Sequence, residues 1–159
     1  MSDIDALDTF DRKILDELQS NGRIRYNELA ERVGLSKTPC LNRVKRLEKQ
    51  GYITGYRADL DADKMLQGYL VFIQVKLADT RRESLTAFNA AVQTIPEIMS
   101  CHMMAGGFDY LLKVRTRDMR TYRHILGDVL AALPGVDQTS SFPVMEQVKE
   151  THAIPIARE

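Results

Sequence analysis

A short stretch of the chain concentrates side chains that can recognise a polyanion. Between Lys37 and Lys49, hydroxyl, amide and basic side chains fill the positions left free by a regular apolar stripe. Asn and Arg side chains can pair with base edges in the major groove of DNA. Lys and Arg side chains also contact phosphates, which fix register without reading sequence. The residue types predict a DNA-reading surface made by Ser36, Lys37, Thr38, Pro39, Asn42, Arg43, Lys45, Arg46 and Lys49.

A helix must position these side chains. Cys40, Val44 and Leu47 recur at i, i+4 and i+7, which is the spacing of a buried helical stripe. Ser36 suits the N-cap, where its hydroxyl is expected to accept a free backbone N–H. Pro39 falls in the first turn, where a missing N–H is tolerated. The spacing therefore predicts a helix from Ser36 to Gln50, stopped by Gly51.

Two further helices and a hairpin are expected around this one. Apolar spacing from Leu7 to Leu18 predicts a first helix with Asp8 as N-cap, and a second covers about 27–33 before the turn at Gly34-Leu35. Two helices joined by a tight turn indicate a helix-turn-helix. The segment 52–58 is interpreted as a short hairpin around Gly55, a wing. A plain three-helix bundle with a solvated basic face is the less favoured alternative.

The charge distribution agrees with a polyanion partner for the first part only. The whole chain has formal net charge zero, yet nine basic and three acidic residues fall between Arg23 and Arg57. From Ala58 onward, 11 basic residues face 13 acidic ones. A locally basic module on a mildly acidic body is a plausible electrostatic footprint for double-stranded DNA.

The remaining hundred residues follow a βαβ–βαβ order. Alternating apolar positions predict strands over 71–77, 98–105, 108–115 and 136–149, and helical spacing predicts helices over 85–95 and 119–133. This order is that of a ferredoxin-like sandwich, so the fold class is α+β. The predicted domains are 1–60 (winged helix-turn-helix), a connector over 61–68, and 69–159 (ferredoxin-like).

Such a sheet has one face that its own helices leave uncovered. In a soluble protein this face needs a partner, most simply a second copy of the chain. A symmetric dimer also places two DNA-reading helices on successive major-groove faces. We therefore expect one domain to read DNA and the other to pair subunits.

The turn at Gly106-Gly107 is the best candidate for a small-molecule site. Two glycines let backbone N–H groups approach an anion, and Asp109 adds a carboxylate beside them. Together these groups match the carboxylate and ammonium of a free amino acid. Judged from these residues alone, an ordinary hairpin turn remains the more favoured interpretation.

Several function classes are excluded or disfavoured. No run of about 18 apolar residues is present, as a membrane span needs, and Met1 to Asp5 lacks the order of a secretion signal. Cys40 and Cys101 are too few for a disulfide scaffold or a thiolate metal site and are interpreted as reduced packing residues. No catalytic triad, metal cluster or phosphate-cradling loop is found, so a cytoplasmic protein that is not an enzyme is expected.

Many short motifs resemble those of the leucine-responsive regulator (Lrp)/AsnC family, closest to the leucine-responsive branch. The resemblance covers nearly the whole chain, in order, and is carried by residues 11–15, 33–36, 38–44, 46–48, 51–53, 106, 108–113, 133–136 and 144–146, with His102. It implies a winged helix-turn-helix, a C-terminal regulatory (RAM) domain and a transcription regulator of amino-acid metabolism genes, associated with the nucleoid. It also implies dimers that assemble further, commonly to octamers.

The resemblance further implies an amino-acid effector bound between dimers, with no other cofactor. The effector-site candidates are Gly106, Gly107, Phe108, Asp109, Met119 and Phe142. Met119 fits core packing almost as well, and leucine, proline and other amino acids all remain open as effectors. Two other functions stay open. One is an enzyme resembling siroheme decarboxylases, which use histidines near a tetrapyrrole; in this sequence His102, His124 and His152 are scattered. The other is an architectural DNA protein without a ligand.

Overall fold

The computed structural model describes residues 7–157 and divides the chain into two compact units. The first unit contains the described residues up to Asp59 together with those from Lys149 onward, and the second runs from Leu60 to Val148. The expected absence of a secretion signal concerns residues outside this range. None of the helices within 7–157 has the length and apolar run needed to cross a bilayer.

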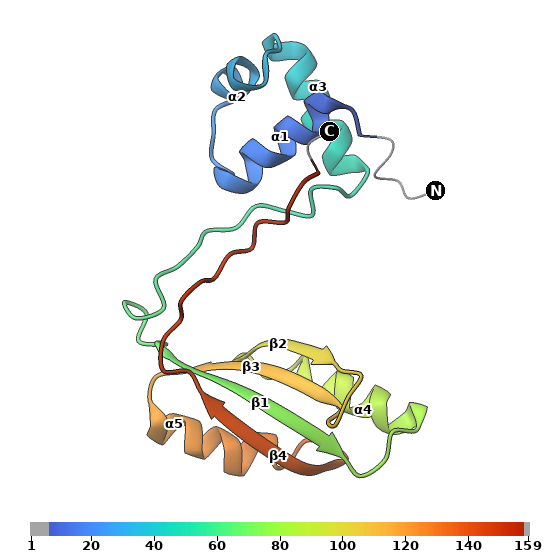
Figure 1. The fold of residues 1–159 in the computed structure, drawn as a ribbon, viewed down its shortest axis with the longest axis vertical. Helices are drawn as coiled ribbons and strands as arrows, with labels where there is room; N and C mark the ends of the chain where they lie inside the picture. The colour runs from blue at the N-terminus through green and yellow to red at the C-terminus, as the bar shows by residue number, and fades with distance from the viewer. Residues whose placement is uncertain (1–6, 158–159) are drawn as a thin grey trace. The chain divides into compact units, whose positions relative to one another are not determined.

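The first unit is built on three helices, α1 (Thr9–Ser20), α2 (Tyr26–Val33) and α3 (Lys37–Lys49) (Figure 1). All three agree with the sequence prediction to within a residue or two at their ends. Their apolar stripes meet in one core, in which Ile14, Leu29 and Leu47 are fully buried. Gly34 ends α2 in the left-handed conformation (φ 77°), which only glycine adopts readily.

Two details of the first unit differ from prediction. Ser36 is the N-cap of α3, but its side chain makes no cap hydrogen bond. A cap side chain bonds the second or third N–H of the helix, and the third residue here is Pro39, which has no N–H. The expected hairpin is also wrong: no strand forms over 53–60. Tyr56 in this segment donates a 2.9 Å hydrogen bond to Glu48 on α3.

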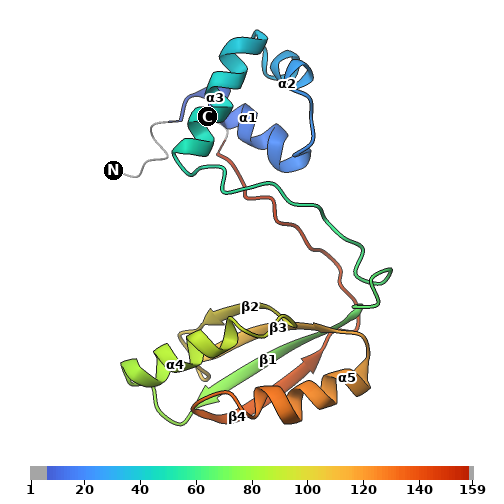
Figure 2. The ribbon, with the colours of Figure 1, turned by 180° about the vertical axis from the view of Figure 1, so that it is seen from behind.

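The second unit is a four-stranded antiparallel sheet in the order β2-β3-β1-β4. Its strands are β1 (Tyr69–Leu77), β2 (Ile98–Met103), β3 (Tyr110–Thr116) and β4 (Val136–Pro143). Helices α4 (Arg82–Val92) and α5 (Met119–His124) lie on one face of the sheet, as Figure 2 shows. The predicted ferredoxin-like βαββαβ arrangement is therefore confirmed.

The core of this unit lies between the sheet and its two helices. Ile73, Leu112 and Phe88 are fully buried there, and the Phe88 and Tyr110 rings lie 4.4 Å apart. The predicted helix over 119–133 is not uniform, since a π-helical turn, η2 (Ile125–Leu130), follows α5. Gly127, a weak helix former, lies in this turn.

The last predicted strand is too long. It ends at Pro143, which has no N–H to donate to a ladder, instead of continuing to 149. The chain then leaves the sheet, and its tail binds the first unit: the Gln19 side chain on α1 accepts from the Ile154 N–H at 2.9 Å and donates to the Ile154 carbonyl at 3.0 Å. The residues from Lys149 onward group with the helices in the first compact unit, whereas the sequence prediction assigned them to the second domain, 69–159.

Candidate nucleic-acid interface and ligand site

Helix α3 presents three different faces. At about 100° per residue, Cys40, Val44 and Leu47 form one face, and all three are fully buried. The opposite side, here called the lysine face, carries Thr38, Asn42, Lys45 and Lys49, all exposed. It is not engaged by any hydrogen bond or ion pair recorded for residues 7–157. This face is free to meet a ligand over the whole length of the helix.

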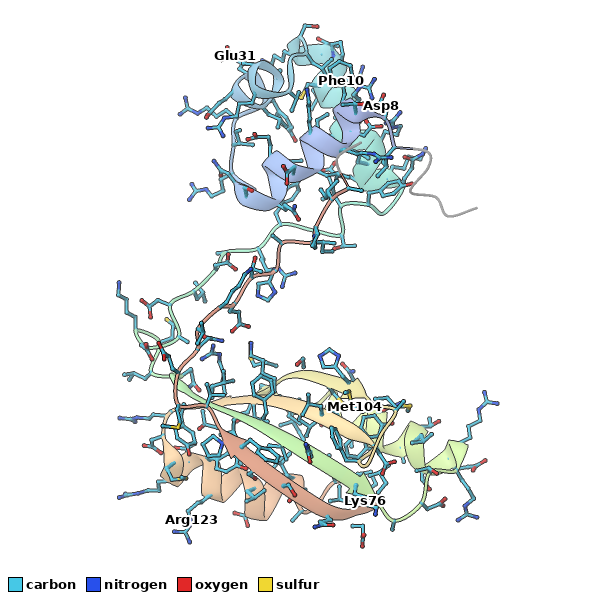
Figure 3. All side chains as sticks on the ribbon, in the orientation of Figure 1. Asp8, Phe10, Glu31, Lys76, Met104 and Arg123 are labelled. Carbon is cyan, nitrogen blue, oxygen red and sulfur yellow. The ribbon has the colours of Figure 1, made fainter. Side chains whose placement is uncertain are left out.

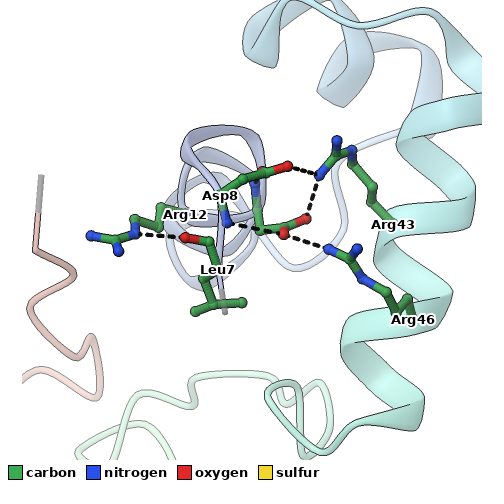
Figure 4. A network of polar contacts seen from close by, with 6 residues as sticks. Leu7, Asp8, Arg12, Arg43 and Arg46 are labelled. Atoms are coloured by element: carbon green, nitrogen blue, oxygen red, sulfur yellow. Dashed lines mark hydrogen bonds and ion pairs between the residues drawn. The ribbon is translucent and has the colours of Figure 1, made fainter. Parts of the chain in front are cut away.

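Arg43 and Arg46 lie on the flank of α3 between these two faces, and both are engaged within the protein. Arg43 Nη1 bonds Asp8 Oδ2 at 2.5 Å and Asp11 Oδ1 at 2.9 Å. Arg46 Nη2 bonds the other oxygen of Asp11, Oδ2. Figure 4 shows both arginines reaching from α3 to the first turn of α1. The structure therefore separates these two residues from the other predicted DNA contacts.

The carboxylates at the start of α1 also organise the helix itself. Asp8 accepts from the Asp11 N–H at 2.9 Å, and Asp11 accepts from the Asp8 N–H at 3.3 Å, which makes a capping box. Burial alone raises the pKa of Asp8, but the bonds from Asp11 N–H and Arg43 outweigh it and leave that pKa below 3.8. The bonds to Asp8 and Asp11 raise the pKa of Arg43. Asp8 and Arg43 are thus charged partners near neutral pH.

The remaining predicted residues cluster at the start of α3. Lys37 and Thr38 are exposed in its first turn beside Pro39. The Ser36 hydroxyl makes no cap bond, so it is available to an external acceptor. Early N–H groups of a helix carry partial positive charge and suit phosphate oxygens. This end of α3 therefore combines hydroxyl, ammonium and helix-dipole contributions.

Asp109, the candidate carboxylate of the ligand site, is fixed to the neighbouring strand. Its N–H donates to the Val75 carbonyl at 2.9 Å, and its Oδ2 accepts from the Leu77 N–H at 2.7 Å. The carboxylate is therefore held at the end of β1 through Oδ2. Met104, labelled in Figure 3, lies just before the same turn and is 40% exposed.

The two glycines of this turn are not required by its backbone. Neither Gly106 nor Gly107 has a left-handed φ, and a Cβ added to either meets no atom within 4 Å. Neither the backbone conformation nor packing within this chain therefore calls for glycine at these two positions.

The other two ligand-site candidates lie elsewhere. Met119 Sδ accepts a hydrogen bond from Tyr69 at 3.2 Å, at the opposite end of β1 from Asp109. The seven residues from Tyr69 to Val75, six steps along the strand, span about 20 Å at the usual rise. Phe142 pairs with Phe72 on the uncovered face and is 49% exposed. One chain does not bring the six candidates together.

The cysteines and histidines offer no competing site. Cys40 is fully buried and Cys101 half-buried, and burial raises the pKa of both thiols, as expected for packing residues. His102 lies on β2 and His124 ends α5, while His152 lies in the tail of the other unit. Within residues 7–157 no group of three or more His, Cys, Asp or Glu side chains is placed to hold a metal ion.

Comparison with known families assigns both units. A winged helix-turn-helix DNA-binding model matches residues 7–54, and an Lrp/AsnC ligand-binding domain model matches residues 70–154. The chain is 54% identical over 147 residues to the proline dehydrogenase transcriptional activator of Rhizobium radiobacter, covering 92% of this chain and 94% of that protein. It is 51% identical to the leucine-responsive regulatory protein of Haemophilus influenzae, covering 92% and 89% of the two chains.

A solved structure agrees with this assignment. A transcriptional regulator of Neisseria meningitidis, crystallised as a complex with L-Met, superposes with a TM-score of 0.90 at 38% identity. The match covers 94% of this chain and 96% of that one.

Proposed function

Since the chain belongs to the Lrp/AsnC family and is a DNA-binding transcription regulator rather than an enzyme, we propose that it reads DNA with the lysine face and the first turn of α3. The proposed contacts are Ser36, Lys37, Thr38, Pro39, Asn42, Lys45 and Lys49. The observation that carries this proposal is the division of α3, whose apolar stripe is fully buried while the opposite side is exposed and unpaired. Its residue types suit base edges and phosphates.

We propose that the regulated genes serve amino-acid metabolism and that a free amino acid is the effector. Relatives named for leucine and for proline dehydrogenase, and a neighbour bound to L-Met, support this class of ligand. The turn at Gly106–Asp109 offers backbone donors for its carboxylate and an anchored carboxylate for its ammonium. Leucine, proline and similar amino acids are the candidates.

The effector site is proposed to lie between copies of the chain. Met119 and Phe142 are separated from Asp109 along the sheet, so a site that uses all the candidates needs residues from more than one subunit. The glycines, which nothing in this chain requires, support close approach by another molecule at the same turn. Phe108 in that turn remains part of the proposed site.

A homodimer through the uncovered sheet face is proposed, with further assembly toward an octamer. Phe72, Phe142 and Leu111 lie on this face, and an apolar surface of this kind is stabilised by burial against a second copy. Phe72→Glu is expected to give monomers in sedimentation or light scattering. Ala90→Glu, an exposed change on α4 at the other face of the sheet, is the control and should leave the dimer intact. We place the protein in the cytoplasm, on the nucleoid, because its DNA is there.

The function is tested by gel shifts on the DNA upstream of the chain's own gene and its neighbours, with and without each of twenty amino acids. A true effector also raises the melting temperature by mass action. Gly106→Val should abolish this rise, while the melting temperature without ligand stays unchanged because the added side chain meets nothing in this chain. If no amino acid alters DNA binding or melting, the protein is an architectural DNA protein instead.

A further inference from the structure

The pairing between α1 and α3 has a consequence for which arginines meet DNA. Asp11 is only 1% exposed, and its two carboxylate oxygens bond two different arginines, Arg43 and Arg46. A buried carboxylate that loses its cations is strongly destabilising. The fold therefore holds Arg43 and Arg46 on the side of α3 that faces α1, whether or not DNA is bound.

Arg43 is held by more than Asp11. It also bonds Asp8 (Figure 4). Its guanidinium lies 5.5 Å from the centre of the Phe10 ring. Only 26% of its side chain is exposed. Two carboxylates and two guanidiniums make a cluster without net charge, so the cluster adds little to the attraction for phosphates.

The lysine face differs from Arg43 both in exposure and in ion pairing. Lys45 and Lys49 are exposed, carry no recorded ion pair and point away from the buried stripe. Arg46 and Lys45 are neighbours in sequence, yet at 100° per residue they project to different sides of α3. A count of basic residues treats Arg46 and Lys45 alike, whereas the structure pairs Arg46 with Asp11 and leaves Lys45 exposed.

We propose that Asp11 is a positioning residue for DNA reading: it locks Arg43 and Arg46 onto α1, which fixes the orientation of α3 and withholds both arginines from the phosphate backbone. This inference rests on the proposed use of α3 to read DNA. The lock limits non-specific attraction, so that discrimination between sequences falls to Asn42 and Thr38. Phosphate contacts are then made by Lys37, Lys45 and Lys49.

The first test compares two adjacent residues. Each phosphate contact contributes about 0.9 to the slope of log binding constant against log salt concentration. Lys45→Gln is expected to flatten the slope by about 0.9. Arg46→Gln, which keeps a donor for Asp11 but removes the charge, should leave the slope unchanged. Flattening by Arg46→Gln equal to that of Lys45→Gln overturns the proposal.

The second test releases the lock. Asp11→Asn frees up to two arginines, so the slope on random DNA should steepen by about 1 to 2 and the preference for specific over random DNA should fall. Glu31→Gln, which removes an exposed carboxylate of α2 in the same unit (Figure 3), is the matched control for net charge. An Asp11→Asn slope equal to that of Glu31→Gln overturns the proposal.

These outcomes separate the inference from the function on which it rests. If the wild-type chain shows no salt-dependent binding, or if Lys45→Gln leaves the slope unchanged, α3 does not read DNA as proposed. If Lys45→Gln flattens the slope and Arg46→Gln does so too, the reading helix stands and only the lock is wrong. Should Asp11→Asn fail to fold, the comparison of Lys45→Gln with Arg46→Gln still tests the proposal.

Discussion

The two units hold their candidate sites in different ways. In the first unit the proposed DNA contacts lie within one helix, between Ser36 and Lys49, and that helix alone determines their relative positions. In the second unit the proposed effector contacts lie on a turn, the start of a helix and an edge strand, at least two of them at opposite ends of β1. The proposed DNA contacts are therefore complete within one chain, whereas one chain does not bring the proposed effector contacts together.

The largest expected effect tests whether the two units unfold independently of each other. Phe88→Ala removes a fully buried ring from the second core and should destabilise that unit by about 3–5 kcal/mol. Leu47→Ala should do the same to the first unit, by about 2–5 kcal/mol. Hydrogen exchange resolved along the chain distinguishes the two. Equal loss of protection in both units from either variant would show that they unfold together.

A smaller effect tests the completeness of the local site. Asn42→Ala should weaken binding to the specific sequence by about 1–3 kcal/mol, because a base contact is lost, and leave binding to random DNA unchanged. Competition gel shifts with specific and random duplexes measure both quantities. An equal loss on the two kinds of DNA would contradict base reading by Asn42.

A smaller effect again tests whether α1 holds the tail of the chain through Gln19 and Ile154. Gln19→Ala removes both side-chain bonds to Ile154, which are solvent-exposed, so a loss of about 1 kcal/mol in local stability is expected. Exchange of the Ile154 amide should become several-fold faster. Gln93→Ala, at the exposed end of α4, is the control. Unchanged exchange at Ile154 would mean that the tail does not depend on α1.

The smallest effect concerns acid. Asp8 has a lowered pKa in the folded state, so its contribution to stability is present above about pH 4 and is lost as the pH falls through the folded value. Asp8→Asn can still cap α1 but should lose less stability than the wild type between pH 5 and pH 3. Chemical denaturation at both pH values measures this, with Asp59→Asn as the control. Equal losses of stability in Asp8→Asn and the wild type would show that Asp8 does not contribute to the loss of stability in acid.

The sequence predicted most of the fold because periodic patterns act locally. The three helices of the first unit, the order of strands and helices in the second, and the buried stripe of α3 were all predicted, and the structure confirms them. The family and the regulatory function followed from motif order, and the relatives confirm both. Errors arose where a segment makes contacts that its own apolar spacing does not contain. Tyr56 bonds Glu48 instead of forming a hairpin, and Gln19 holds a tail that was expected to extend β4.

The sequence by itself determined which helix carries the polar and basic side chains proposed to read DNA, since helical period and side-chain chemistry are properties of a short segment. Only the tertiary structure decided that Arg43 and Arg46 serve Asp11 while Lys45 stays free, because that depends on how α1 packs against α3. It likewise decided that Asp109 and Met119 lie at opposite ends of a strand, because strand pairing sets distances that spacing along the chain does not contain.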